Sequence, residues 1–208
     1  MGSKTSNLSN HRLLPLIIPV IIRVIIRVII PVFLLLSLAS AACSEASPAF
    51  GKYFRGRTLD LSVVTLERLP ELRYATIDTN QVTHHYRIAP SSDDLELVLL
   101  RIKVENHTAT SAIVNIDGQA AELRDFLKGT YRPIDVNERV EEVPAPENPG
   151  DERFMVFLWN QTLEGGTSKA FELKKDFGLD GWMIFEAPRD NKFRELRWRA
   201  GDSLTIEF

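Results

Sequence analysis

The 208-residue chain contains a single cysteine, Cys43. A lone cysteine excludes an intramolecular disulfide framework and a zinc site built from several cysteines. The chain also lacks the G-x-S-x-G motif of a serine nucleophile and the D-x-D-x-D-G spacing of a calcium-binding loop. The Gly165-Gly166 pair lacks the lysine and the helix context of a phosphate loop. No motif in the sequence therefore assigns a reaction or a catalytic residue.

Acidic residues are missing from the first 42 positions, whose only Lys and Arg side chains are Lys4, Arg12, Arg23 and Arg27. With four of the 25 Lys and Arg placed there, the rest of the chain has 21 basic and 28 acidic residues, a formal charge of −7. That mild acidity gives no electrostatic case for binding nucleic acid or anionic lipid. We therefore expect no nucleic-acid partner.

The run from Leu13 to Ala42 is almost wholly aliphatic, and its only charges are Arg23 and Arg27. Each arginine at the centre of a membrane-spanning helix costs about 2.5–3.5 kcal/mol, which disfavours a span centred on this pair. Leaving both arginines on the cytoplasmic side gives a basic leader, an apolar block at Val28–Leu38 and the small residues Ala39–Ala42. This is the order of regions in a secretory signal, so export of the C-terminal part is predicted.

Cys43 directly follows the residues Leu-Ala-Ser-Ala-Ala, and this stretch resembles a bacterial lipobox. In a lipobox the cysteine takes a diacylglycerol and becomes the mature N-terminus, although Ser40 stands here where an aliphatic residue is usual. An uncleaved membrane anchor and full secretion remain alternatives. All three place the body on the exported side of the cell membrane, with residues 1–43 as a signal peptide or anchor and Cys43 as the predicted lipidation site.

Beyond the leader, residues 44–58 are rich in small residues, Gly and Arg and show no hydrophobic period, which predicts a tether. Residues 59–208 suit a single domain. Their dominant pattern has a period of two, clearest where Val98, Leu100, Ile102 and Val104 alternate with charged residues. This alternation is typical of a strand with one buried face.

Similar stretches predict further strands at Leu61–Leu69, Leu72–Ile77, His84–Ile88, Ser111–Ile116, Tyr131–Val136, Phe154–Trp159, Ala170–Lys174, Gly181–Pro188, Leu196–Ala200 and Ser203–Phe208. Turn residues separate them at Asp117-Gly118, Lys128-Gly129, Glu164-Gly165-Gly166 and Ala200-Gly201-Asp202. Propensity favours a short helix in the segment 118–129, but its context among strands predicts a strand. The acidic, proline-rich stretch Asn137–Gly150 is predicted to be an exposed loop, and Asp180-Gly181 a turn. Many short strands at regular spacing indicate an all-β sandwich or barrel.

Two of these stretches, Val98–Asn106 and Gly181–Pro188, together resemble the telokin-like extracellular domain of bacterial lipoproteins, a domain of unknown function. The first is an alternating strand ending in Asn, and the second combines Gly, an apolar pair, Phe, an acid and Pro. The resemblance implies an immunoglobulin-like antiparallel β-sandwich that follows an N-terminal hydrophobic signal or anchor helix. It implies export and interaction rather than catalysis.

His84-His85 is the pair best suited to a metal, yet adjacent side chains of a strand point to opposite faces. A zinc site would need one of them together with His107 and Asp93 or Asp94. Calcium ligands could come from Asp93, Asp94 and Glu96, or from Glu141, Glu142, Glu147, Asp151 and Glu152. Solvated surface charge is the simpler interpretation of these acids, so we expect no metal and no cofactor.

The tryptophans, Trp159, Trp182 and Trp198, are expected mainly in the core, although two on one exposed face would mark a partner surface. We predict a contact surface formed by Trp159, Asn160 and Gln161 together with Glu141 and Glu142.

These observations favour a membrane-tethered, extracytoplasmic, non-catalytic binding or accessory module of the bacterial cell envelope. Its partner would be an unidentified protein or small ligand. One alternative is an exported metal-dependent hydrolase that uses His84, His85 and nearby acids. The other is a structural subunit docked on an integral membrane complex.

Overall fold

The computed structural model describes residues 47–163 and 165–208. The predictions for the export segment, the anchor helix and Cys43 lie outside these residues. Within the described part of the chain, no helix is both long enough and apolar enough to cross a membrane.

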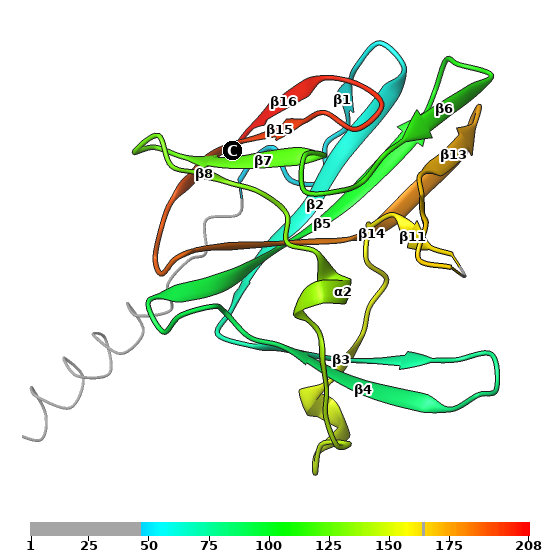
Figure 1. Cartoon of the computed structure of the whole chain (residues 1–208). Coiled ribbons are helices and arrows are strands. Elements are labelled where there is room, and N and C mark those ends of the chain that lie inside the picture. Colours follow the sequence, from blue (N-terminus) through cyan, green and yellow to red (C-terminus); the bar gives the residue numbers. More distant parts are fainter. Residues whose placement is uncertain (1–46, 164) are drawn as a thin grey trace, which may run out of the picture. The chain divides into compact units, whose positions relative to one another are not determined.

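A four-stranded sheet in the order β1-β2-β5-β14 runs through the middle of the body (Figure 1). Its strands are β1 (Phe54–Arg55), β2 (Leu59–Leu69), β5 (Leu95–Asn106) and β14 (Gly178–Pro188). The pairing of β14 with β5 is unbroken from Gly178 opposite Glu105 to Pro188 opposite Leu95. Every strand pair in this central sheet is antiparallel.

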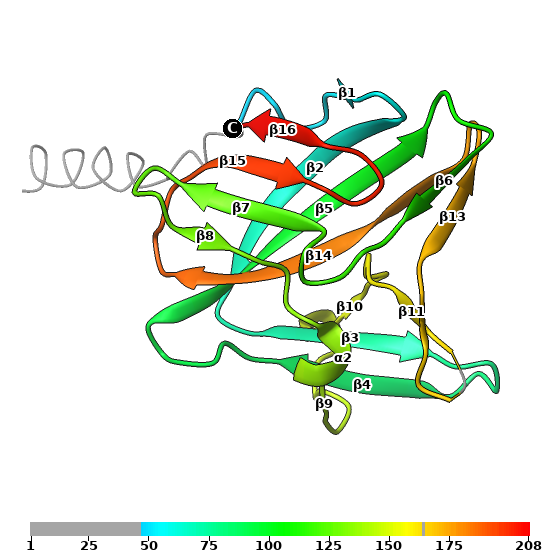
Figure 2. The ribbon, with the colours of Figure 1, turned by 45° about the horizontal axis from the view of Figure 1, so that its top comes forward.

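A second layer covers one face of the central sheet (Figure 2). It consists of the sheet β16-β15-β7-β8 and the pair β13-β6. Their bounds are β6 (Ser111–Val114), β7 (Ala121–Asp125), β8 (Thr130–Tyr131), β13 (Phe171–Lys174), β15 (Phe193–Trp198) and β16 (Leu204–Glu207). All of these pairings are antiparallel. The main core between the layers includes Leu61, Leu100, Ile102, Phe185, Leu123, Leu196, Trp198 and Ile206. The predicted all-β sandwich is therefore confirmed.

A further sheet in the order β10-β3-β4-β9 lies against the other face of the central sheet. It is built from β3 (Leu72–Ile77), β4 (Thr83–Ile88), β9 (Glu141–Glu142) and β10 (Arg153–Phe154), with the short helix α2 (Val136–Arg139) beside it. This second core contains Leu72, Tyr74, Ile88, Leu97, Leu99, Val136, Met155 and Ile184. The remaining elements are the turn η1 (Pro149–Asp151) and the pair β11 (Gln161–Thr162) and β12 (Ser168–Lys169).

Strand β5 contributes to both cores, which its alternating pattern did not predict. The even-numbered residues Val98 to Val104 face the main core as expected, whereas Leu97 and Leu99 are fully buried in the second core. Leu95 and Glu96 at the start of the strand, and Arg101, Lys103 and Glu105 further along it, retain contact with solvent. The segment Leu97–Leu100 of β5 is thus buried on both faces.

Two predicted strands are wrong, and both lie where the chain passes the edge of β14. In the segment Tyr131–Val136, β8 ends at Tyr131, Pro133 offers no backbone donor, and Asp135 caps α2 by accepting from the Asn137 amide at 2.9 Å. In the segment Phe154–Trp159, β10 ends at Phe154. The Leu158 amide then donates to the Trp182 carbonyl at 2.8 Å, outside any regular strand.

The acidic stretch Asn137–Gly150 also departs from the prediction of a simple loop. It holds most of α2 and the two residues of β9, which pair with Tyr86 and Arg87 of β4. Arg139 of α2 contacts Glu186 at 3.2 Å and donates to the Ala89 carbonyl at 2.9 Å. These contacts fix the first part of the stretch against the body.

Residues 47–58, predicted to be part of a tether, pack onto the sandwich instead. Ala49 is buried, and the Gly51 amide donates to the Val63 carbonyl at 2.8 Å. Phe54 pairs with Leu61, and the Phe50 ring meets Phe208 edge to face at 5.4 Å. The tether prediction is corrected for these residues, because apolar side chains spaced along a Gly-rich stretch find tertiary partners that local periodicity does not reveal.

The segment 118–129 contains the predicted strand, β7, despite its helical propensity. Ala121 and Leu123 are fully buried in the main core, and Leu123 pairs with Leu196 of β15. Tertiary packing overrides a weak local preference here.

Asp180-Gly181, predicted to be a turn, lies inside β14. A Cβ atom on Gly181 would stand 2.8 Å from the Val156 carbonyl oxygen, so glycine allows the neighbouring chain to approach β14 closely. Asp180 pairs with Arg101 on β5 through two contacts of 2.9 Å.

The double burial of β5 leads to a stability prediction. We expect Leu99→Ala to reduce the free energy of unfolding by about 2–5 kcal/mol, because it leaves a cavity in the second core. Denaturant unfolding would measure the loss. Ile113→Ala, at a side chain that is 61% exposed, is the control and should change stability by less than about 0.5 kcal/mol. Equal losses for both variants would contradict burial of Leu99.

Candidate ligand-binding recess

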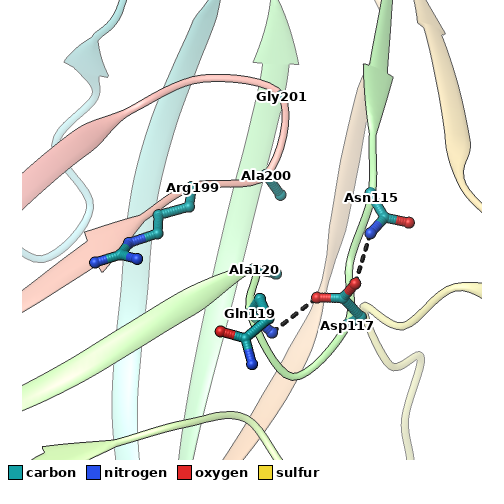
Figure 3. A pocket seen from close by; sticks show the side chains of 7 residues that line it. All are labelled: Asn115, Asp117, Gln119, Ala120, Arg199, Ala200 and Gly201. Atoms are coloured by element: carbon teal, nitrogen blue, oxygen red, sulfur yellow. Dashed lines mark hydrogen bonds between the residues drawn. The ribbon is translucent and has the colours of Figure 1, made fainter.

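A polar recess opens where the β6–β7 connection meets the β15–β16 turn (Figure 3). Its volume is about 250 Å³, and it is lined by Asn115, Asp117, Gln119, Ala120, Arg199, Ala200 and Gly201. The sequence predicts turns at Asp117-Gly118 and Ala200-Gly201-Asp202, but not that they lie side by side. The recess arises because the fold brings two distant turns together.

Asp117 organises the first wall of the recess. Its Oδ1 accepts from the Gln119 backbone amide at 2.7 Å, and its Oδ2 accepts from the Asn115 side-chain amide at 2.6 Å. The Ala120 amide donates to the Asp117 carbonyl at 3.0 Å. An aspartate that hydrogen-bonds the backbone two residues on is a common way to fix a tight turn.

The second wall follows directly from strand β15. The Arg199 amide donates to the Ala120 carbonyl at 2.7 Å, which joins the two walls. The buried Trp198 ring donates through Nε1 to the Ala200 carbonyl at 2.7 Å. Gly201 has a φ of 73°, a left-handed conformation that glycine adopts without strain. The turn is therefore held by the main core beneath it.

The guanidinium of Arg199 extends away from Asp117 (Figure 3) and pairs with Glu122 at 3.1 Å. The Asn115 amide and the Asp117 carboxylate already hydrogen-bond one another and their neighbours, so among the lining groups the Gln119 side-chain amide is the one with no hydrogen bond to the described residues. It can donate and accept hydrogen bonds with a small polar group. The volume lies below the roughly 300–1,000 Å³ of pockets for drug-sized ligands, so it suits one small ring or one side chain of a partner.

The predicted surface residue Asn160 supports the recess from behind. Its Oδ1 accepts from the Ile116 amide at 2.8 Å, and its Nδ2 donates to the Asn115 Oδ1 at 2.8 Å. Asn160 is almost fully buried, so its role is to position Asn115. Trp159 packs against the second core, and Gln161 is exposed on β11.

Glu141 and Glu142, the other predicted contact residues, make their contacts elsewhere. Both are exposed on β9, where Glu141 pairs with Arg87 at 3.1 Å and Glu142 lies 3.4 Å from His84. No hydrogen bond or ion pair among the described residues joins them to Trp159, Asn160 or Gln161.

The two adjacent histidines of β4 make separate contacts, as their strand position predicts. His84 lies 3.5 Å from Asp78 and 3.4 Å from Glu142, whereas Nδ1 of His85 lies 2.8 Å from Glu152. Among residues 47–163 and 165–208, no group of three or more His, Cys, Asp or Glu has the geometry to hold a metal ion.

The other residues considered for zinc or calcium are also drawn to separate partners. His107 lies 3.5 Å from Asp60, and Glu96 pairs with Arg68. Asp94 accepts from the Ser92 hydroxyl at 2.5 Å. The residues that a zinc site would need are therefore not brought together.

The three tryptophans divide between the two cores. Trp198 is fully buried in the main core, as expected. Trp159 and Trp182 are half-buried against the second core.

No protein-family model matches the chain, and no curated protein sequence does so either. Among solved structures, the chain is similar to the YjhA protein from Bacillus subtilis, with 14% identity and a TM-score of 0.44 over 76% of this chain and 97% of that one. It is also similar to the candidate lipoprotein YcdA of Bacillus subtilis subsp. subtilis, with 12% identity and a TM-score of 0.43. That match covers 75% of this chain and 38% of YcdA.

A third similar structure is an uncharacterized beta-sandwich protein from Clostridium difficile, with 8% identity and a TM-score of 0.39. The match covers 76% of this chain and 91% of the Clostridium difficile protein. Sequence identities and TM-scores this low assign no function to the chain.

The position of His84 between two carboxylates leads to a pH prediction. Glu142 first, and then Asp78, raise the pKa of His84 above its ordinary 6.5. A raised folded-state pKa means that protonated His84 stabilises the fold below the unfolded pKa, and that this contribution is lost as pH rises through the folded pKa. Glu142→Gln should lower the pKa of His84, as measured by NMR titration.

Glu141→Gln is the matched control, since Glu141 contacts Arg87 and not His84. It should leave the titration of His84 nearly unchanged. The same pKa in the wild type and in Glu142→Gln would refute the assigned contact.

Proposed function

We propose that this protein is a membrane-tethered, extracytoplasmic binding or accessory module of the cell envelope that acts without catalysis. We further propose that its sandwich is immunoglobulin-like and related to the telokin-like domains of bacterial lipoproteins. The order of basic, apolar and small residues before Cys43 supports export and attachment. The β-sandwich supplies a rigid support for loops that recognise a partner.

The recess at Asn115, Asp117 and Gln119 is the observation that carries the binding role. Asn115, Asp117 and Gln119 line a space of about 250 Å³, and a buried asparagine and a buried tryptophan hold its two walls. Preorganised polar groups of this kind lose little conformational freedom when a ligand binds. A sugar ring, an amino acid or a side chain of an envelope protein fits this chemistry.

Attachment is tested by the mass of the mature N-terminus in the native host. We expect a diacylglycerol on Cys43 and loss of residues 1–42, because the small residues before Cys43 resemble a processing site. An intact Met1 in the membrane fraction would indicate an uncleaved anchor, and an unmodified N-terminus in the medium would indicate secretion. Full-length protein in the cytoplasm would contradict the proposal.

Ligand binding is tested by thermal unfolding of the detergent-solubilised full chain with a panel of monosaccharides and amino acids. We expect one chemical class to stabilise the protein. A ligand present at 100 times its Kd adds about 2.7 kcal/mol to the free energy of unfolding. Gln119→Ala should abolish the effect, because it removes an exposed amide at the recess without removing a hydrogen bond of the fold.

Gln81→Ala is the matched control, since Gln81 is an exposed glutamine in the β3–β4 turn. It should keep the full stabilisation. If no compound stabilises the wild type, or if Gln119→Ala responds as the wild type does, the recess is not a small-ligand site. Co-purification of the chain with a fixed membrane complex would then favour the docked structural subunit.

A further inference from the structure

The turn between β7 and β8 presents two large apolar side chains to solvent. Phe126 is 62% exposed and Leu127 is 86% exposed, the highest value among the exposed large hydrophobic residues of the described chain. They are adjacent in sequence at the tip of a hairpin (Figure 2). Two such neighbours on a projecting turn form an apolar tip that the fold itself does not use.

The conformation of this tip is fixed by a buried carboxylate. Oδ1 of Asp125 accepts from the Leu127 amide at 2.8 Å and from the Gly129 amide at 2.6 Å, and Oδ2 accepts from the Tyr131 hydroxyl at 2.9 Å. Asp125 is only 4% exposed. The side chains of Phe126 and Leu127 are therefore displayed by a preorganised turn.

Backbone geometry imposes the same turn. Lys128 has a φ of 72°, in the left-handed region. A Cβ atom on Gly129 would stand 2.4 Å from Oδ2 of Asp125, so only glycine fits there. Together these features constrain the backbone of the turn, in which Lys128 follows the two apolar residues.

A second turn, between β14 and β15, is joined to the first. The Asn191 side-chain amide donates to Oδ2 of Asp125 at 2.8 Å and to the Tyr131 hydroxyl at 2.7 Å. Arg68 donates to the Asn191 carbonyl and holds this turn in place. Residues near Asn191 therefore lie at the same end of the sandwich as Phe126 and Leu127.

These two turns carry local positive charge on an acidic body. Lys128, Arg189 and Lys192 are exposed there, against one exposed acid, Asp190. The loop that packs behind them is acidic, and Asp94 accepts through its backbone carbonyl from the Arg189 amide at 3.2 Å. The two turns are therefore locally basic on a body of net charge −7, although Asp94 of the neighbouring loop faces Arg189.

The described chain also begins at this end. Phe50 packs on Phe208, and the Phe208 amide donates to the Arg194 carbonyl at 2.8 Å, two residues beyond Lys192. Cys43 precedes Ser47 by four residues, a length of chain that spans at most about 14 Å. The length of this chain limits how far a lipid on Cys43 can lie from Ser47.

We propose that the β7–β8 tip is a second membrane contact, in which Phe126 and Leu127 enter the interface of an anionic bilayer and Lys128, Arg189 and Lys192 meet its headgroups. Apolar side chains flanked by lysine and arginine are suited to the bilayer interface, where the rings and aliphatic chains are buried and the cations stay at headgroup level. The inference rests on the proposed tethering to bring a bilayer near this end. It adds an orientation of the body on the membrane.

The test uses the full chain with Cys43→Ser, reconstituted in phosphatidylcholine vesicles with or without phosphatidylglycerol. A polarity-sensitive fluorophore is attached at Leu127→Cys. The matched control is Phe177→Cys, because Phe177 is 65% exposed on the β13–β14 turn, at the opposite end of the sandwich in both views (Figures 1 and 2). We expect the Leu127 label to shift to the blue and to be quenched by brominated lipids in anionic vesicles, and the Phe177 label to stay in water.

Charge is tested in the same system with Lys192→Gln, with Lys175→Gln on the β13–β14 turn as control. Each basic residue near an anionic surface changes partitioning by about five-fold, so Lys192→Gln should lower the shielded fraction of the Leu127 label by about that factor at low salt. Lys175→Gln should leave that fraction unchanged.

The outcomes separate this inference from the proposed tethering. If the chain floats with the vesicles while the Leu127 label is as exposed to water as the Phe177 label, the tip is not a membrane contact and tethering stands. That result would leave a protein partner to cover the tip. If the chain does not float at all, the tip does not bind the bilayer and the inference fails. The lipid on Cys43, which this variant lacks, is tested separately by the mass of the mature N-terminus.

Discussion

The double burial of strand β5 is the constraint on which the rest of the structure depends. Even-numbered side chains from Val98 to Val104 form the middle of the main core, while Leu97 and Leu99 belong to the second core. The register of β5 is strongly specified, since a shift of one residue would turn Arg101 and Lys103 toward the main core. The long pairings of β5 with β2 and β14 hold this register, and both outer layers are positioned against it.

Buried polar side chains fix the surface loops to this framework. Asn160 aligns the recess through Asn115, and Asp125 shapes the β7–β8 tip. Asp202 similarly accepts from the Thr58 and Leu59 amides at 2.8 and 3.1 Å, which secures the start of β2. Each of these side chains accepts hydrogen bonds from backbone amides that the sheets leave unpaired. Removing such a side chain would leave a backbone donor without a partner. Rigid loops of this kind suit recognition more than large rearrangement.

Charged side chains on the outer face of β15 pair with one another. On the outer face of β15, Glu195 lies at 2.9 Å from Arg194 and 2.7 Å from Arg197, while Glu122 pairs with Arg199. These charges compensate one another within the sheet. The basic residues of the β7–β8 and β14–β15 turns lie outside this network, and Asp94 of the neighbouring loop faces Arg189.

The sequence by itself determined the all-β class, most of the strands and most of the turns, because alternation and turn chemistry act between near neighbours. It also predicted that His84 and His85 lie on opposite faces of one strand. Only the tertiary structure decided that Leu97 and Leu99 are covered, that residues 47–58 pack on the sandwich, and that the segment 132–136 leaves the sheet for a capped helix. The recess likewise depends on contacts such as that of Asn160 with Asn115, between residues 45 positions apart. Such contacts carry no local sequence signal, because their energy depends on which distant surfaces the folded chain brings together.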